Sequence, residues 1–241
     1  MTTAATVSGR PLTRRERLRT ATLAEIKEIA RRRLIEDGSA RVSLRAIARD
    51  MGMTPAALYR YVPGIEALVE AILADVREEA ARALEEARDA ADPTDPLAQL
   101  TTLGRALRSW VLSHSAEFAL ALGEYGRHTP DPERPGVDDR LVPAYRELFL
   151  ATVTRQWQRR PFPMPPDLDP ELAGPLTAVA ERVGCTLPLP ALYVALRCYG
   201  RVWGAILVEV SGHLPVDVDG AGALFEAELA DTVRCFRGPH D

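Results

Sequence analysis

The chain has 241 residues, of which 46% are hydrophobic and 27% charged, so its composition is that of a globular protein with one large domain or two smaller ones. Its formal net charge of −4 is unevenly distributed, because residues 1–65 carry 13 Lys or Arg against 6 Asp or Glu, whereas residues 66–241 carry 17 against 28. The overall acidity therefore hides a basic N-terminal part.

Several classes of protein are excluded by what the sequence lacks. The apolar runs are shorter than the roughly 18 residues that a membrane span needs, and no apolar region follows the N-terminal arginines as it would in a secretory signal. The three cysteines, Cys185, Cys198 and Cys235, are too far apart for a disulfide framework or a paired-cysteine metal site. We expect a cytoplasmic protein without a membrane, metal or cofactor.

The periodicity of apolar residues predicts an all-α fold. Apolar positions recur three and four residues apart, Ala, Leu, Arg and Glu are abundant, and no long alternating β-branched stretch occurs. The first helix carries apolar residues from Leu23 to Leu34 on one face and ends at Asp37-Gly38, where glycine suits a left-handed cap.

Two starts fit this first helix. Thr13 with Glu16 and Thr22 with Glu25 both have the spacing of a capping box. In the first case the arginines of residues 14–19 lie on the helix, and in the second they lie in a mobile arm.

Two short helices should follow in quick succession. Ser43 is a suitable N-cap for a helix that runs to Met51, and Gly52 breaks it. Thr54-Pro55 then starts a third helix, which ends near Tyr61-Val62. Three helices thus fit into about 45 residues.

A long fourth helix is predicted from Ile65 to about Ala91, before Pro93 and Pro96. Proline-rich stretches at His128–Gly136 and Arg160–Asp169 are interpreted as surface loops. The remaining apolar periodicity predicts six further helices, at 97–113, 115–125, 138–159, 170–183, 189–212 and 219–237. We divide the chain into a basic arm (1–19), a three-helix domain (20–64) and a C-terminal domain (65–241).

Residues 43–61 have the layout of a helix-turn-helix, in which a helix, a tight turn and a second helix with a slim N-terminal end follow one another. Small residues at the start of the second helix would let it enter the major groove of DNA. The residue types there suit hydroxyl, methyl and guanidinium contacts with bases and phosphates. The predicted DNA-binding residues are Arg14, Arg15, Arg17, Ser43, Arg45, Thr54, Pro55, Ala56, Tyr59, Arg60 and Tyr61.

In this part the sequence resembles the TetR family of transcriptional regulators. The resemblance covers about 45 residues and is carried by Ile26, Ala30, Gly38, Ile47-Ala48, Gly52, Leu58-Tyr59-Arg60-Tyr61, Glu66 and Leu68. The chain departs from the family pattern at Val62, where an aromatic residue is common, and at Ile65, where a lysine contacts phosphate. The N-terminal arginines are candidates to replace that charge.

The resemblance implies a ligand-responsive repressor that binds a palindromic operator as a dimer and is released by a small-molecule effector. The last two helices would form the dimer interface, and Arg201–Ala205 with Glu209 and Gly212-His213 is similar to a subgroup with a Trp-Gly helix. Gly200 and Gly204 would allow close approach of a helix from the same subunit or from its partner.

Large aromatic residues in the C-terminal domain are candidates for the effector pocket, although packing in the core explains each of them equally well. They are Trp110, Phe118, Tyr125, Phe149, Trp157, Tyr199 and Trp203. His114 and Glu117 have a metal-compatible spacing but no evident third ligand.

Two other functions compete with the repressor. An enzyme or carrier would need a catalytic or cofactor motif, and neither a nucleophile elbow nor a phosphate-binding glycine loop occurs in the sequence. The chain is therefore not expected to be an enzyme. An activator or an architectural factor would share the same DNA-binding motif, and the sequence does not separate either of them from a repressor.

Overall fold

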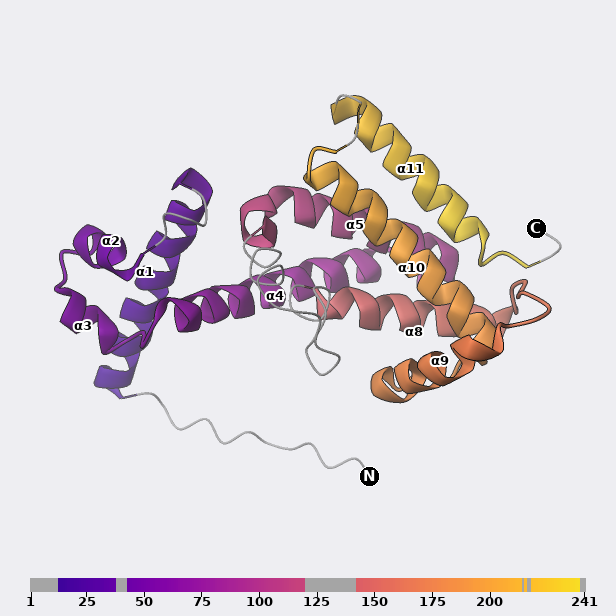
Figure 1. The fold of residues 1–241 in the computed structure, drawn as a ribbon, viewed down its shortest axis with the longest axis horizontal. Helices are drawn as coiled ribbons and strands as arrows, with labels where there is room; N and C mark the ends of the chain where they lie inside the picture. Colours follow the sequence, from indigo (N-terminus) through magenta and orange to yellow (C-terminus); the bar gives the residue numbers. More distant parts are fainter. Residues whose placement is uncertain (1–12, 38–42, 120–141, 214, 216–217, 239–241) are drawn as a thin grey trace. The chain divides into compact units, whose positions relative to one another are not determined.

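The computed structural model describes residues 13–37, 43–119, 142–213, 215 and 218–238. Every regular element in these ranges is a helix, so the predicted all-α fold is confirmed (Figure 1). The chain divides into two units, residues 1–74 and 75–241, and the division falls inside helix α4 (Ile65–Ala90).

The first unit holds α1 (Arg14–Asp37), α2 (Leu44–Asp50), α3 (Pro55–Tyr59) and the first turns of α4. Its α1 begins at the earlier of the two predicted starts. The Thr13 amide donates to the Glu16 carboxylate at 2.7 Å, and the Glu16 amide donates to the Thr13 hydroxyl at 3.2 Å. This reciprocal pair is a capping box, so residues 14–19 lie on the helix.

The second unit contains the rest of α4 with α5 (Pro96–Ser113), α8 (Pro143–Arg159), α9 (Pro170–Val183), α10 (Leu189–Val210) and α11 (Val218–Arg234). The Asp95 side chain caps α5 by accepting from two amides at 3.0 Å, and the Asp169 side chain caps α9 by accepting from the Glu171 amide at 2.9 Å. Proline follows each cap at the first helical position, where its missing N–H is harmless. The helices agree with the predicted ranges to within a few residues, except that α8 starts only at Pro143.

Helix α10 is central to the second unit, where it packs against α5, α8, α9 and α11. Its inward side chains include Leu192, Cys198 and Trp203, all buried. Helix α11 also packs against α5, at a close approach that Gly104 makes possible, since a Cβ there would lie 2.6 Å from a methyl group of Leu229. Among the described helices, α10 is long and apolar enough to cross a membrane, but its inner face is the core of this unit.

The proline-rich segment 160–169 is irregular as predicted, but it is not purely a surface loop. Phe162 is 3% exposed and packs edge-on against Trp157 and Phe236, so this loop closes one end of the core. A further helix starts at residue 115 and continues to 119. Its predicted remainder to residue 125 and the loop His128–Gly136 lie outside the described residues.

Candidate nucleic-acid interface and effector site

The turn between α2 and α3 is set by local hydrogen bonds. The Ser43 hydroxyl accepts from the Ala46 amide at 3.3 Å at the start of α2, and the Thr54 hydroxyl accepts from the Ala57 amide at 3.2 Å at the start of α3. Between the helices Gly52 has φ +63°, a conformation that favours glycine. The two predicted caps and the glycine turn are therefore confirmed.

Burial fixes which face of α3 points outward. Leu58 is fully buried and belongs to the core that Ile47 and Ala48 of α2 also join. Tyr59, the next residue, is 53% exposed, an unusual position for a large aromatic side chain. The helix thus presents a separate outer surface.

The exposed residues around α3 coincide with those predicted to touch DNA. Thr54, Pro55, Ala56, Tyr59 and Arg60 are exposed on α3 or at its ends. Their roles as base or phosphate contacts stay predictions. Ser43 and Arg45 are exposed at the start of α2, and Arg14, Arg15 and Arg17 on α1.

Arginines of α1 and the end of α3 line one basic pocket of about 460 Å³. The Arg19 guanidinium anchors it by donating to the Arg60 carbonyl at 3.1 Å and by lying 5.5 Å from the ring centre of Tyr61. The lining residues are Arg14, Arg15, Leu18, Arg19, Arg60 and Tyr61. Three positively charged side chains beyond Arg19 thus surround a hollow where an anion would find complementary charge.

The pocket includes some of the predicted DNA-binding residues and leaves out others, and the roles of both groups stay predictions. Tyr61 is half-buried and lines the pocket beside Arg19, whereas Arg17 does not line it. Arg19 lines the pocket but was not among the predicted residues, although its spacing of four from Arg15 places both on one face of a helix.

One arginine of the 31–33 run is held by an acidic partner. Arg33 forms a two-pronged pair with Asp50, at 2.6 Å from Nε and 2.8 Å from Nη2, which ties α1 to the end of α2. The guanidinium holds the pKa of Asp50 below its ordinary value of 3.8. Arg33 therefore serves the fold of the first unit.

In the second unit, four of the predicted pocket aromatics gather around one residue that was not predicted. The Tyr145 ring centre lies 5.5 Å from that of Tyr199 and 6.3 Å from that of Trp203. Phe149 and Phe118 extend the cluster, at 5.6 Å from Tyr199 and 6.2 Å from Trp203 respectively. The spacing of four between Tyr145 and Phe149 was a signal for it, since both lie on one face of α8.

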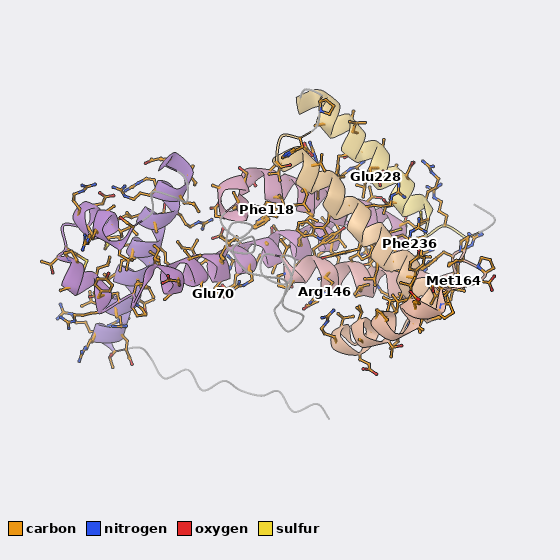
Figure 2. All side chains as sticks on the ribbon, in the orientation of Figure 1. Glu70, Phe118, Arg146, Met164, Glu228 and Phe236 are labelled. Carbon is orange, nitrogen blue, oxygen red and sulfur yellow. The ribbon has the colours of Figure 1, made fainter. Side chains whose placement is uncertain are left out.

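The other predicted aromatic residues either lie at the far end of this ring cluster or do not belong to it. Trp157 joins the series through Phe162 and Phe236, and Figure 2 labels Phe118 and Phe236, which lie far apart along the second unit. Trp110 stacks on His114 instead, with ring centres 4.4 Å apart. Tyr125 lies outside the described residues.

Trp203 carries an unsatisfied polar group in the middle of the cluster. Its side chain is 7% exposed, and its indole N–H finds no acceptor among the described residues. A buried donor without an acceptor costs about 1–3 kcal/mol. An acceptor from outside the described residues would remove this cost.

His114 does not belong to a metal site in the described part of the chain. Its Nδ1 lies 2.9 Å from the Trp110 carbonyl oxygen and its Nε2 lies 3.7 Å from the Glu79 carboxylate on α4. No group of three potential metal ligands occurs among the described residues. The contact links the end of α5 to α4.

A second pocket of about 480 Å³ lies between α8 and the end of α9. None of the aromatic candidates in the described ranges lines it. Its walls are formed by charged, hydroxyl, small and aliphatic side chains, including Arg146, Thr154, Arg182, Cys185 and Leu150.

Comparison with known proteins places both units in one family. Residues 26–72 match the model for bacterial regulatory proteins of the tetR family, and residues 100–232 match that for the tetracyclin repressor-like C-terminal domain. The HTH-type transcriptional regulators Rv1816 of Mycobacterium tuberculosis and Mb1846 of Mycobacterium bovis are each 31% identical over 212 residues, which are 85% of this chain and 88% of theirs.

Solved structures agree with this assignment. The crystal structure of the regulatory protein SCO4313 has a TM-score of 0.67 and 29% identity, over 91% of this chain and 98% of its own. The tetR-family regulator PfmR of Thermus thermophilus shares the fold, with a TM-score of 0.53 and 16% identity over 90% and 99% of the two chains. The chain therefore belongs to the tetR family of bacterial regulatory proteins, as a transcriptional regulator with a DNA-binding helix-turn-helix.

Proposed function

We propose that the chain is a homodimeric repressor that binds a palindromic operator and is released by a small-molecule effector. The observation that carries the proposal is the capped, outward-facing α3 with an arginine-lined pocket at its end. Acting on DNA, the protein would work in the cytoplasm.

The start of α3 suits base reading in the major groove. Ala56 offers a methyl group for contact with thymine, and Thr54 and Tyr59 offer hydroxyl groups. Arg60, at the other end of the helix, offers a guanidinium that can bond to guanine or to phosphate. All four side chains are exposed.

The basic pocket supplies the phosphate contact that the family makes with a lysine at the position of Ile65. Arg14, Arg15 and Arg60 all line it, so a phosphate oxygen there would face guanidinium groups from two helices. The support from Arg19 keeps Arg60 in place beside α1. We infer that the charge lost at position 65 is replaced by this pocket.

The dimer would form through α10 and α11, as it does in the family. Gly200 and Gly204 of α10 face open space, since a Cβ added at either would meet nothing within 4 Å. Val208 is 40% exposed one turn further along, and Leu224 of α11 is 50% exposed. The side chains on these outer faces are small or apolar. We therefore infer that Gly200 and Gly204 allow close approach of a helix from the partner rather than from the same subunit. Two α3 helices would then enter successive major grooves about 34–36 Å apart.

The aromatic cluster is the proposed effector site. Aromatic rings around Trp203 would contact an apolar part of the effector, while the indole N–H would donate to an acceptor on it. The nearby His114 contact with Glu79 gives a route by which a change at the end of α5 would shift α4. An effector that prefers a different α4 orientation would weaken DNA binding.

The first experiment is selection of bound duplexes from random DNA with the full-length protein. A palindrome with half-sites one helical turn apart supports the proposal, whereas enrichment of no sequence, or of a single half-site, contradicts it. Deletion of the gene then separates a repressor from an activator, because transcripts beside the operator rise in the first case and fall in the second.

The second experiment tests the residues on the selected operator. We expect Tyr59→Ala to lose about 1–3 kcal/mol of specific binding, and Arg60→Ala and Arg14→Ala each to lower the salt dependence by about one phosphate contact. Arg237→Ala, an exposed arginine of the second unit, is the control and should leave both quantities unchanged. Wild-type affinity and salt dependence in all three test variants would contradict the proposal that α3 contacts the operator.

A further inference from the structure

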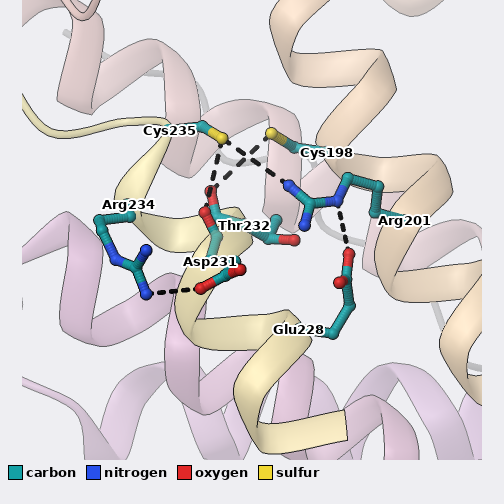
Figure 3. A network of polar contacts seen from close by, with 7 residues as sticks. All are labelled: Cys198, Arg201, Glu228, Asp231, Thr232, Arg234 and Cys235. Carbon is teal, nitrogen blue, oxygen red and sulfur yellow. Dashed lines mark hydrogen bonds and ion pairs between the residues drawn. The ribbon is translucent and has the colours of Figure 1, made fainter. Parts of the chain in front are cut away.

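Two of the three cysteines face each other between α10 and α11. Cys198 is buried on α10, and Cys235 lies partly exposed just beyond the last residue of α11 (Figure 3). The Cys198 thiol donates to the Thr232 carbonyl at 3.8 Å, and the Cys235 thiol donates to the neighbouring Asp231 carbonyl at 3.5 Å. The two acceptors are carbonyls of adjacent residues in α11, so both thiols belong to one network of contacts (Figure 3).

An arginine stands beside the pair. Arg201 Nη1 lies 3.9 Å from the Cys235 sulfur, and its positive charge also acts on Cys198. Glu228 accepts from Arg201 Nε at 2.5 Å and holds the guanidinium in this position. The Cys235 sulfur therefore lies against a cation that a carboxylate holds in place.

The two thiols differ in their surroundings. Burial, followed by the neighbouring Cys235, raises the pKa of Cys198 to about 12, so Cys198 stays a protonated thiol. Cys235 is accessible and has the guanidinium at its sulfur. A partly exposed thiol beside a buried second thiol is the arrangement of an attacking and a resolving cysteine.

We propose that Cys235 and Cys198 form a peroxide-sensitive thiol pair that closes to an intrachain disulfide between α10 and the end of α11. The Cys235 thiolate attacks one oxygen of a hydroperoxide, so that an S–O bond forms, the O–O bond breaks, and the leaving oxygen takes a proton to become an alcohol or water. The Cys198 sulfur then attacks the sulfur of Cys235, the S–O bond breaks, and the hydroxide leaves as water with the proton of the Cys198 thiol.

The pair is independent of the proposed operator and effector. The two thiols together lose two electrons and one hydroperoxide gains them, so no further reactant is needed. The product bond would add a covalent link between two helices that the reduced protein holds together by packing and polar contacts.

The test uses the full-length protein, reduced, freed of reductant and treated with one equivalent of hydrogen peroxide. We expect loss of two of the three thiols per chain, recovery of both with dithiothreitol, and unchanged monomer mass on denaturing gels without reductant. After trypsin digestion, residues 198–201 and 235–237 should appear as one cross-linked peptide.

Cys185→Ser is the matched control, since Cys185 is also partly exposed and lies near arginine side chains but away from the thiol pair. This variant keeps only Cys198 and Cys235, and peroxide should consume both of these thiols. Cys198→Ala should stop at a Cys235 sulfenic acid that dimedone traps. A cross-link that involves Cys185 or a second chain, oxidation of Cys235 with Cys198 left as a thiol, or no loss of thiol would each overturn the proposal.

Discussion

Asp50 gives the first unit a pH-dependent contribution to stability through its pair with Arg33. Because Arg33 lowers the pKa of this carboxyl in the folded state, the contribution is complete above its ordinary value of 3.8 and is lost as pH falls through the lowered value. We therefore expect Asp50→Asn to lower the free energy of unfolding at pH 7 and to lower it by less at pH 3. Urea denaturation followed by circular dichroism at both pH values measures this.

Asp89→Asn is the control for that experiment. Arg88 also lowers the pKa of Asp89, but the two are adjacent on α4 and Asp89 is exposed, so their pair joins no second helix. Asp89→Asn should lower the free energy of unfolding at pH 7 by less than Asp50→Asn does. A difference between wild type and Asp50→Asn that is the same at pH 7 and pH 3 would contradict the role assigned to the pair.

Single residues also mark what the sequence could and could not reveal. The caps Ser43 and Thr54 were predictable because a cap acts within three residues of itself. The partners of Arg33 and Arg19 are 17 and 41 residues away, so only the folded chain identifies them.

At the scale of helices, a partly buried ion pair joins α5 to α10. Arg108 binds the Glu209 carboxylate through Nη2 at 2.5 Å and Nε at 2.7 Å, and the Glu209 side chain is 8% exposed. Arg108→Met leaves that carboxylate buried without its cation, for which we expect a loss of about 3 kcal/mol in the free energy of unfolding. Chemical denaturation at neutral pH measures it.

Two further variants separate burial from pairing. Arg105→Met removes the exposed pair with Glu226 on α11 and should cost less than about 1 kcal/mol. The double variant Arg108→Met with Glu209→Leu removes both charges of the partly buried pair and should recover most of the loss. Equal losses for Arg105→Met and Arg108→Met would contradict the argument.

The helices themselves were largely predictable, whereas the aromatic cluster that they build in the second unit was not. Capping aspartates, prolines and apolar periodicity define α5, α9 and α10 locally. The grouping of Tyr145 with Trp203, and the separation of Trp110 from both, depends on how α8 and α10 pack. Periodicity contains no information about which helices become neighbours.

For the whole molecule, the proposed dimer is the property on which operator binding would depend. Leu224 is 50% exposed on α11, and in a two-fold interface it would be buried in both subunits, at about 2 kcal/mol each. We expect Leu224→Glu to yield monomers in sedimentation equilibrium. Because each monomer would then contact a single half-site, the slope of operator affinity against salt should fall by about half.

Met164→Glu is the matched control, as Met164 is 41% exposed in the irregular segment 160–169, away from the proposed interface. It adds the same charge at a similarly exposed apolar side chain, so it should remain a dimer with wild-type salt dependence. If Leu224→Glu is dimeric and Met164→Glu is not, the partner surface lies on that segment instead. If both remain dimeric, Leu224 lies outside the interface and the α10 stripe at Gly200 and Gly204 must be tested by itself, since a bulky side chain there would block close approach of a second helix.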